Sequence, residues 1–182
     1  MGKRECDMER HSDCVLSITF SCDGTRIMLG LEDMSVQVWI VTTSEIGHVL
    51  GAHLCQVTSV AFSADGSLVV STLSDNSGQI WNATTREMVC MLKGHSCEER
   101  SVTFSADRMC IRTGLLDESI QIWDLTLGET KHILLGHSWW VPSVAFSPDG
   151  RRVVSHSQGK AVRIRNAFTG GIEQVLEGHS FE

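Results

Sequence analysis

The sequence has no tyrosine and only two prolines, against 16 glycines, in its 182 residues. No apolar run approaches the ~20 residues that a membrane-spanning helix needs. The opening MGKRECDMER is charged throughout and lacks the apolar stretch of a secretory signal peptide. These absences predict a protein that does not contact a membrane and that is located in the cytoplasm, with the nucleus as the alternative.

The chain also lacks a regular cysteine framework. Its seven cysteines are an odd number and include no Cys-x-x-Cys pair, which argues for reduced thiols and against a disulfide scaffold or a zinc site. We therefore expect no cofactor and no metal. The formal net charge is -7 and no basic stripe spans the sequence, so nucleic acid is not an expected partner.

What the sequence does contain is an internal repeat of 42 residues. Five histidines mark it without a slip in phase: His11, His53, His95, His137 and His179. Phenylalanine, aspartate and tryptophan recur in the same register, although Arg165 takes the tryptophan position of the fourth copy. The predicted organisation is an N-terminal remnant, four repeats and the start of a truncated fifth: residues 1–10, 11–52, 53–94, 95–136, 137–178 and 179–182.

Each period is expected to fold as four short β-strands. In the fourth copy, residues 141–146 alternate apolar with small or polar residues, and SPDG at 147–150 is typical of a hairpin turn. Three further strands are expected at 151–156, 161–165 and 172–176. No stretch has a helical period, so the prediction is an all-β fold. Four strands per ~40 to 45 residues are characteristic of one propeller blade.

Several copies of one signature, all in phase, carry a resemblance to a known family. A Gly-His pair precedes the first strand and a Trp-Asp or Trp-Asn pair ends the third: Gly94-His95 with Trp123-Asp124, Gly136-His137 with SVAFSPDG, and GAH at 51–53 with Trp81-Asn82. In these motifs the chain resembles the WD40-repeat β-propeller family over essentially its whole length. Family members commonly close with about seven blades. The resemblance therefore implies four four-stranded antiparallel blades in an incomplete, open propeller.

The resemblance also implies a structural hydrogen-bond relay in two copies. Each relay has a histidine, a hydroxyl residue, an aspartate and a tryptophan: His53, Ser71, Asp75 and Trp81 in the second copy, and His95, Thr113, Asp117 and Trp123 in the third. A Ser-His-Asp set also suggests a hydrolase, but an enzyme needs one activated nucleophile in one cleft. This set recurs, and a half-buried indole N–H needs an acceptor. We interpret the relay as structural and expect no catalytic residue.

The first and fourth copies depart from the relay pattern. Leu29 occupies the hydroxyl position of the first copy. In the fourth, Gly159 replaces the aspartate and Arg165 replaces the tryptophan, which predicts a lost relay and an arginine head that reaches solvent or a carboxylate. Arg108 replaces the turn glycine of the third copy, where a side chain at positive φ is mildly strained.

In propellers of this family one rim usually binds partners, and it is formed by the loops that enter the first strands and the turns between second and third strands. The resemblance maps this rim onto Asp13, Gln56, Glu98, Trp139 and Trp140. In an alternating strand entry both tryptophans cannot face the core, so we expect at least one on the rim, where tryptophan is a common interface anchor. The alternative is that Trp139 packs on a neighbouring loop. A leucine also recurs in the second turn and either adds to the rim or fills the hub: Leu31, Leu73 and Leu115.

Charge is unevenly distributed along the array. The four repeats carry formal charges of -4, -1, -3 and +2 in order. The basic last blade can therefore dock on an acidic first blade. An open arc is the favoured arrangement; a tight four-bladed ring and an assembly of two arcs that complete one another are the alternatives. Self-association through exposed end blades is thus a possible mode of assembly.

These patterns predict a non-catalytic protein–protein interaction scaffold or ligand-sensing module whose partners are other proteins. The near-uniform period is similar to that of WD arrays in fungal and bacterial NACHT-type signalling proteins, which implies a sensing or autoinhibitory role. One alternative is a degenerate gene fragment without independent activity. A propeller hydrolase is the least favoured alternative, because the sequence shows no unique site.

Overall fold

The computed structural model describes residues 13–50, 53–93, 97–107, 109–125, 129–158 and 161–177. Within these residues the chain forms sixteen β-strands and no helix. The strands are β1 (Val15–Phe20), β2 (Arg26–Leu31), β3 (Val36–Ile40), β4 (Glu45–Leu50), β5 (Val57–Phe62), β6 (Leu68–Leu73), β7 (Gly78–Asn82), β8 (Met88–Leu92), β9 (Glu99–Phe104), β10 (Cys110–Leu115), β11 (Ile120–Asp124), β12 (Glu129–Leu134), β13 (Ser143–Phe146), β14 (Arg152–His156), β15 (Ala161–Asn166) and β16 (Ile172–Glu177). They pair in chain order into four antiparallel sheets of four strands. A helix long and apolar enough to cross a membrane does not occur in the described part of the chain.

The turn between the first and second strands of each sheet is closed by a serine and an aspartate. In the second sheet the Ser63 hydroxyl donates to Asp65 (2.7 Å) and accepts from the backbone N–H of Leu68 (2.9 Å). Gly66 between them has a φ of 67°, which glycine adopts without strain. The same serine–aspartate bond recurs in the other sheets from Ser21, Ser105 and Ser147. Arg108, predicted to strain this turn in the third repeat, lies outside the described residues.

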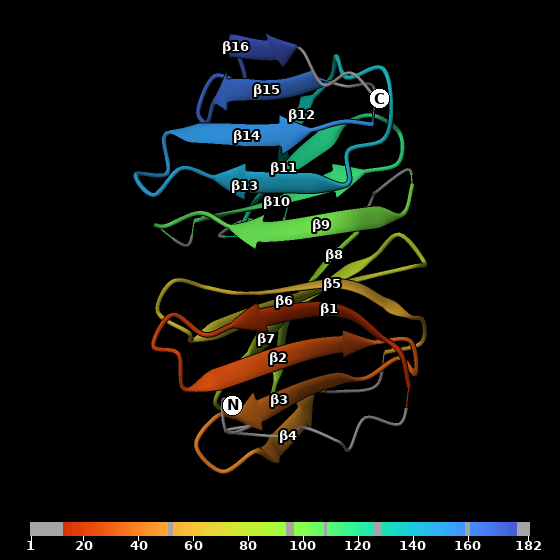
Figure 1. The fold of residues 1–182 in the computed structure, drawn as a ribbon, viewed down its shortest axis with the longest axis vertical. Helices are drawn as coiled ribbons and strands as arrows, with labels where there is room; N and C mark the ends of the chain where they lie inside the picture. The colour runs from red at the N-terminus through yellow and green to blue at the C-terminus, as the bar shows by residue number, and fades with distance from the viewer. Residues whose placement is uncertain are drawn as a thin grey trace, which may run out of the picture.

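The first strands of successive sheets lie side by side, in the order β1, β5, β9 and β13 (Figure 1). A serine in each of three first strands accepts a hydrogen bond from a valine N–H in the next. The pairs are Ser17 with Val60 (3.1 Å), Ser59 with Val102 (3.3 Å) and Ser101 with Val144 (3.2 Å). This ladder fixes each sheet against its neighbour in the same register.

The hydrophobic core lies between sheets. Each sheet has a face toward the preceding sheet, here called its leading face, and a face toward the following sheet, its trailing face. At the first junction, Met28, Val38 and Leu50 on a trailing face pack against Val60 and Trp81 on a leading face. The second and third junctions repeat this arrangement one and two periods later. Burial therefore depends on contact between neighbouring sheets, as in repeat proteins generally.

The four sheets form an open arc. In Figure 1 the first sheet lies at the bottom and the fourth at the top, with the second and third between them. The leading face of the first sheet keeps its own cluster of Ile27, Leu29, Leu31 and Trp39. The prediction of an all-β fold with four four-stranded antiparallel blades in an open propeller is confirmed.

Candidate interaction surfaces

The second blade brings three of its four predicted relay residues together. The His53 imidazole is bonded through Nε2 to the Ser71 hydroxyl (2.9 Å), and the indole N–H of Trp81 donates to the same oxygen (3.4 Å). Strand pairing positions them, because β6 carries Ser71 and β7 carries Trp81. The Asp75 carboxylate accepts from the backbone N–H (3.1 Å) and hydroxyl (2.6 Å) of Ser77, and so closes the β6–β7 turn.

The third blade repeats this geometry where it is described. The indole N–H of Trp123 donates to the Thr113 hydroxyl (3.5 Å), and Asp117 accepts from the N–H (3.1 Å) and hydroxyl (2.5 Å) of Ser119. His95 lies outside the described residues. In both blades the hydroxyl is fully buried.

The first blade uses an acceptor that sequence reasoning missed. Leu29 removes the hydroxyl, and the indole N–H of Trp39 instead donates to the side-chain oxygen of Gln37 (3.1 Å). Gln37 is buried and lies two residues before the tryptophan on β3. The signal was available, because Gln37, Gln79 and Gln121 recur at the repeat period. His11 lies outside the described residues.

In the fourth blade, the prediction that the head of Arg165 reaches solvent or a carboxylate is wrong. Arg165 is buried, and its guanidinium donates to the backbone carbonyls of Leu135 (2.6 Å) and Gly170 (3.2 Å). Burial, together with the nearby charge of Arg163, lowers the pKa of Arg165. Backbone carbonyls supply acceptors for Nη1 and Nη2, while Nε is buried without a hydrogen-bond partner among the described residues. Gly159, which replaces the acid, lies outside the described residues.

The fourth blade also keeps a histidine–hydroxyl pair. His137 is bonded through Nε2 to the Ser155 hydroxyl (2.7 Å), as His53 is to Ser71. Burial, with the neighbouring charges of Arg163 and Arg165, lowers the pKa of His137 to about 4. The imidazole is therefore neutral in the folded protein at neutral pH.

The lowered pKa of His137 predicts a loss of stability in mild acid. An unfolded histidine titrates near pH ~6.5, so the folded state takes up fewer protons than the unfolded state between pH ~6.5 and about 4. This contribution is fully present above that window and is lost as the pH falls through it. Urea unfolding measured from pH 7 to pH 4.5 should show a smaller decline for His137→Gln than for the wild type. Equal slopes for His137→Gln and the wild type would contradict the prediction.

The predicted rim residues lie along one edge of the arc. In every blade, a backbone carbonyl of the entering loop accepts from an N–H of the turn between second and third strands: Cys14 from Glu32 (3.0 Å), Gln56 from Ser74 (3.0 Å), Glu98 from Leu116 (3.2 Å) and Trp140 from Gln158 (3.1 Å). The Gln56 amide also donates to the Glu32 carboxylate (2.9 Å) and so joins the first two blades. Asp13 accepts from the N–H of Cys14 (2.8 Å). The rim is thus a hydrogen-bonded edge.

Both tryptophans of the fourth entering loop are exposed on this rim. Trp139 is 57% exposed and Trp140 47%, although Val141 after them is buried. The Ser157 hydroxyl donates to the backbone carbonyl of Trp139 (2.8 Å). The loop backbone is therefore fixed while two indoles face outward. The three recurring leucines do not join them, because Leu31, Leu73 and Leu115 are buried.

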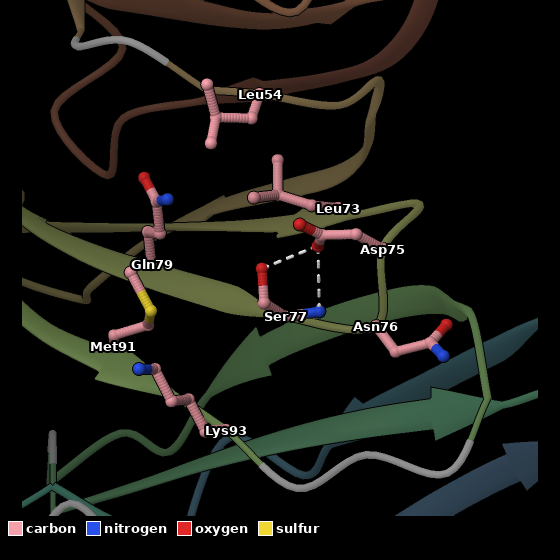
Figure 2. Close-up of a pocket in the computed structure, with 8 residues that line it drawn as sticks. All are labelled: Leu54, Leu73, Asp75, Asn76, Ser77, Gln79, Met91 and Lys93. Carbon is pink, nitrogen blue, oxygen red and sulfur yellow. Dashed lines mark hydrogen bonds between the residues drawn. The ribbon is translucent and has the colours of Figure 1, made fainter.

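A hollow of about 470 Å³ adjoins the rim in the second blade (Figure 2). Its lining combines the β6–β7 turn, strands β7 and β8, and the entering loop: Leu54, Leu73, Asp75, Asn76, Ser77, Gln79, Met91 and Lys93. Leu54 is exposed at its edge and offers an apolar contact beside the polar turn. The hollow extends the rim with a surface of mixed chemistry.

One group of potential metal ligands lies on the rim among the described residues. Asp13, Cys14 and Glu32 bring a carboxylate, a thiol and a second carboxylate within 4.8 Å of one another. The hydrogen bond and negative charge of Glu32 raise the pKa of the Cys14 thiol. Because the thiolate is the form that binds a metal, this environment works against coordination by sulfur.

Comparison with known protein families finds a match over three segments of the chain. The WD40 family, described as WD domain, G-beta repeat, matches residues 2–39, 44–82 and 128–166, which together make up more than half of the chain. The third blade lies largely outside these segments, yet its sheet has the same strand order as the others. A search of the curated proteins found no match. The predicted repeat boundaries stay a prediction.

Proposed function

The chain belongs to the WD40-repeat family, and on that basis we propose that it is a non-catalytic scaffold or ligand-sensing module that binds another protein through its rim. WD40 repeats indicate a protein-interaction scaffold in general. The observation that carries the finer proposal is the pair of exposed indoles, Trp139 and Trp140, on a hydrogen-bonded loop. Tryptophan is enriched among the residues that dominate binding energy at protein interfaces.

The non-catalytic part of the proposal rests on access. Ser71, Thr113 and Ser155 occupy the hydroxyl position of the relay in the second, third and fourth copies, and all three are buried. Nucleophilic catalysis needs a nucleophile that the substrate can reach, beside groups that stabilise the developing charge. The similarity to NACHT-type WD arrays supports a sensing role but stays a prediction, as do a cytoplasmic or nuclear location and the absence of nucleic-acid and membrane partners.

The fourth blade keeps part of its hydrogen bonding despite the substituted tryptophan. Arg165 donates to two backbone carbonyls, and the His137–Ser155 bond remains beside it. The Nε of Arg165 and the Nε and Nη1 of Arg163 are buried without a hydrogen-bond partner in the described part of the chain, which is costly for charged groups. A degenerate gene fragment without independent activity therefore stays an alternative to the scaffold.

The proposal predicts that Trp139→Ala/Trp140→Ala weakens partner binding by about 30-fold or more, the effect of losing roughly 2 kcal/mol at an interface anchor. The measurement is affinity capture of proteins by the tagged chain, followed by titration of the captured partner. Phe168→Ala is the matched control, because Phe168 is also an exposed aromatic residue but lies in the β15–β16 turn, at the opposite end of the same sheet. Undiminished binding by the double variant would contradict the proposal.

A further inference from the structure

We propose that the chain associates head to tail with a second copy of itself, the trailing face of the fourth sheet docking on the leading face of the first sheet in the second copy. This contact is separate from the rim on which the proposed function depends. A second copy fits these faces because the trailing face of the fourth sheet and the leading face of the first sheet correspond to the two sides of a junction that the chain already builds three times.

Along β1, the leading face of the first sheet exposes apolar side chains that later sheets bury, whereas the cluster of Ile27, Leu29, Leu31 and Trp39 on the same face is buried within the chain. Ile18 is 62% exposed and Phe20 59%. One period later, Val60 is buried and Phe62 packs against the first junction. An exposed apolar patch on a sheet face marks a site of protein contact. The part of the leading half of a junction that the first sheet leaves open is therefore the one along β1.

The trailing face of the fourth sheet presents the other half. Val154 is 38% exposed and Leu176 48%. Their counterparts two periods earlier, Val70 and Leu92, are fully buried in the second junction. Ile164, also on this face, is only partly buried, whereas Ile80 at the same position of the second sheet is buried.

The serine ladder also continues across the ends. Each of the three inner junctions uses a serine hydroxyl to accept the N–H of the residue 43 positions later. Ser143 is the fourth serine of that series and is exposed. In the register of the inner junctions, the Ser143 hydroxyl would accept a hydrogen bond from the N–H of Ile18 in the second copy. The polar groups of the two ends thus match as well as their apolar ones.

An arginine–phenylalanine contact gives a third match. At the first junction Arg26 lies over the Phe62 ring (5.1 Å) and donates to the backbone carbonyl of Gly66 (2.9 Å). Arg152 has the position of Arg26 in the fourth sheet and is exposed, paired with Glu173 on its own sheet (2.8 Å). The proposed contact places Arg152 over Phe20 of the second copy. Such stacking is favourable between a guanidinium and an aromatic face.

Formal charge is complementary between the two ends. Residues 11–52 carry one arginine against five carboxylates, and residues 137–178 carry five basic residues against three carboxylates. Asp23, in the turn beside Phe20, has a pKa lowered to about 2 by hydrogen bonds from Ser21 and Thr25 and is therefore charged. Opposite net charge favours the head-to-tail encounter over contact between two like ends.

One residue weakens this junction relative to the inner ones. His156 stands where the first and third sheets have Gly30 and Gly114. A Cβ added at Gly30 meets a side-chain methyl of Val57 at 2.7 Å, so a larger side chain at this position has to turn aside for the sheets to meet. We therefore expect the head-to-tail contact to be reversible, and His156→Gly to strengthen it.

Cysteine cross-linking tests the orientation directly. Two full-length variants carry Cys14→Ser and Cys22→Ser, which remove exposed thiols, together with either Ile18→Cys or Ser143→Cys. The variants bear tags of different size. Each variant is oxidised alone, and a mixture of the two is oxidised in parallel. We expect the mixed disulfide to exceed both like-with-like products by at least about tenfold. Thr19→Cys replaces Ile18→Cys in the control, because it lies on the other face of β1 and should not cross-link to Ser143→Cys.

Every outcome of this experiment decides the proposal. Dominant products from Ile18→Cys alone or Ser143→Cys alone would replace head-to-tail docking with a symmetric dimer, and equal cross-linking of Thr19→Cys would indicate random collision. Absence of any product, with His156→Gly also monomeric in sedimentation, would overturn association between copies. Trp139→Ala/Trp140→Ala should leave the cross-link unchanged, so failure of this proposal is distinguishable from failure of the rim proposal.

Discussion

Replacing Trp123 by alanine is expected to lower the free energy of unfolding by about 3–5 kcal/mol, the usual cost of removing a large buried aromatic side chain. Trp123 is 1% exposed and lies on the leading face of the third sheet. It packs in one cluster with Val70, Ile80 and Leu92 of the second sheet. Its loss leaves a cavity in a junction between blades, where the core lies, and also leaves the Thr113 hydroxyl without the indole donor.

Trp140→Ala is the matched control for this measurement. The same chemical change is made at a side chain that is 47% exposed on the rim, so the expected change in unfolding free energy is within about 0.5 kcal/mol. Urea denaturation followed by circular dichroism compares the two variants with the wild type. A loss below about 1 kcal/mol for Trp123→Ala would mean that the junctions do not carry the stability of the array.

The second large effect is expected from Gly114→Ala at the third junction. A Cβ at Gly114 lies 2.6 Å from the backbone carbonyl oxygen of Val141 and 3.2 Å from a methyl group of Val144. The first of these atoms is backbone and cannot turn aside, so the third and fourth sheets must move apart. Overpacking of this kind costs about 1–3 kcal/mol. The same denaturation measurement should show that loss.

Gly171→Ala provides the control for a glycine that no junction constrains. The nearest atom to a Cβ there is the Thr169 hydroxyl oxygen at 3.4 Å, an ordinary contact. Alanine restricts the unfolded chain more than glycine does, so Gly171→Ala should be neutral or stabilising by up to about 1 kcal/mol. Equal stability of Gly114→Ala and Gly171→Ala would contradict the close packing of the third junction.

The period of the sequence was enough to predict the strands, because each strand pairs with the next one along the chain and the serine–aspartate turns are local. Sixteen strands and four sheets follow from a pattern that repeats every 42 residues. The predicted strand at 141–146 is shorter in the structure, where β13 begins at Ser143, because the entering loop extends through Pro142. Such boundaries depend on where the entering loop contacts the turn between the second and third strands. The alternation of residues within one strand carries no information about that contact.

Contacts across a sheet and between sheets were harder to predict. The acceptor role of Gln37 requires knowing that it and Leu29 are cross-strand partners, so that the amide takes the place of the missing hydroxyl. The burial of Arg165 depends on the carbonyl of Leu135, which precedes it by 30 residues. In both cases the aligned repeats reveal the unusual residue, but only the three-dimensional structure reveals its hydrogen-bond partner.

For the candidate interaction surfaces too, one feature was predicted from the sequence and another was not. The rim position of Trp139 and Trp140 was predicted from their place in the repeat, since an adjacent pair cannot both enter the core. The sequence left open whether Leu73 and its repeats join the rim, because their exposure depends on the sheets on either side. The structure buries them and leaves the two indoles as the main apolar feature of the fourth loop.

Amide hydrogen exchange by NMR tests most directly the central claim, that one repeating junction joins the blades and is left open at the ends. In dilute protein, the N–H groups of Val60, Val102 and Val144 should exchange slowly, because each donates to a serine of the preceding blade. The equivalent N–H of Ile18 has no preceding blade among the described residues and should exchange much faster. Exchange of all four at one rate, or fast exchange at the three valines, would contradict the account.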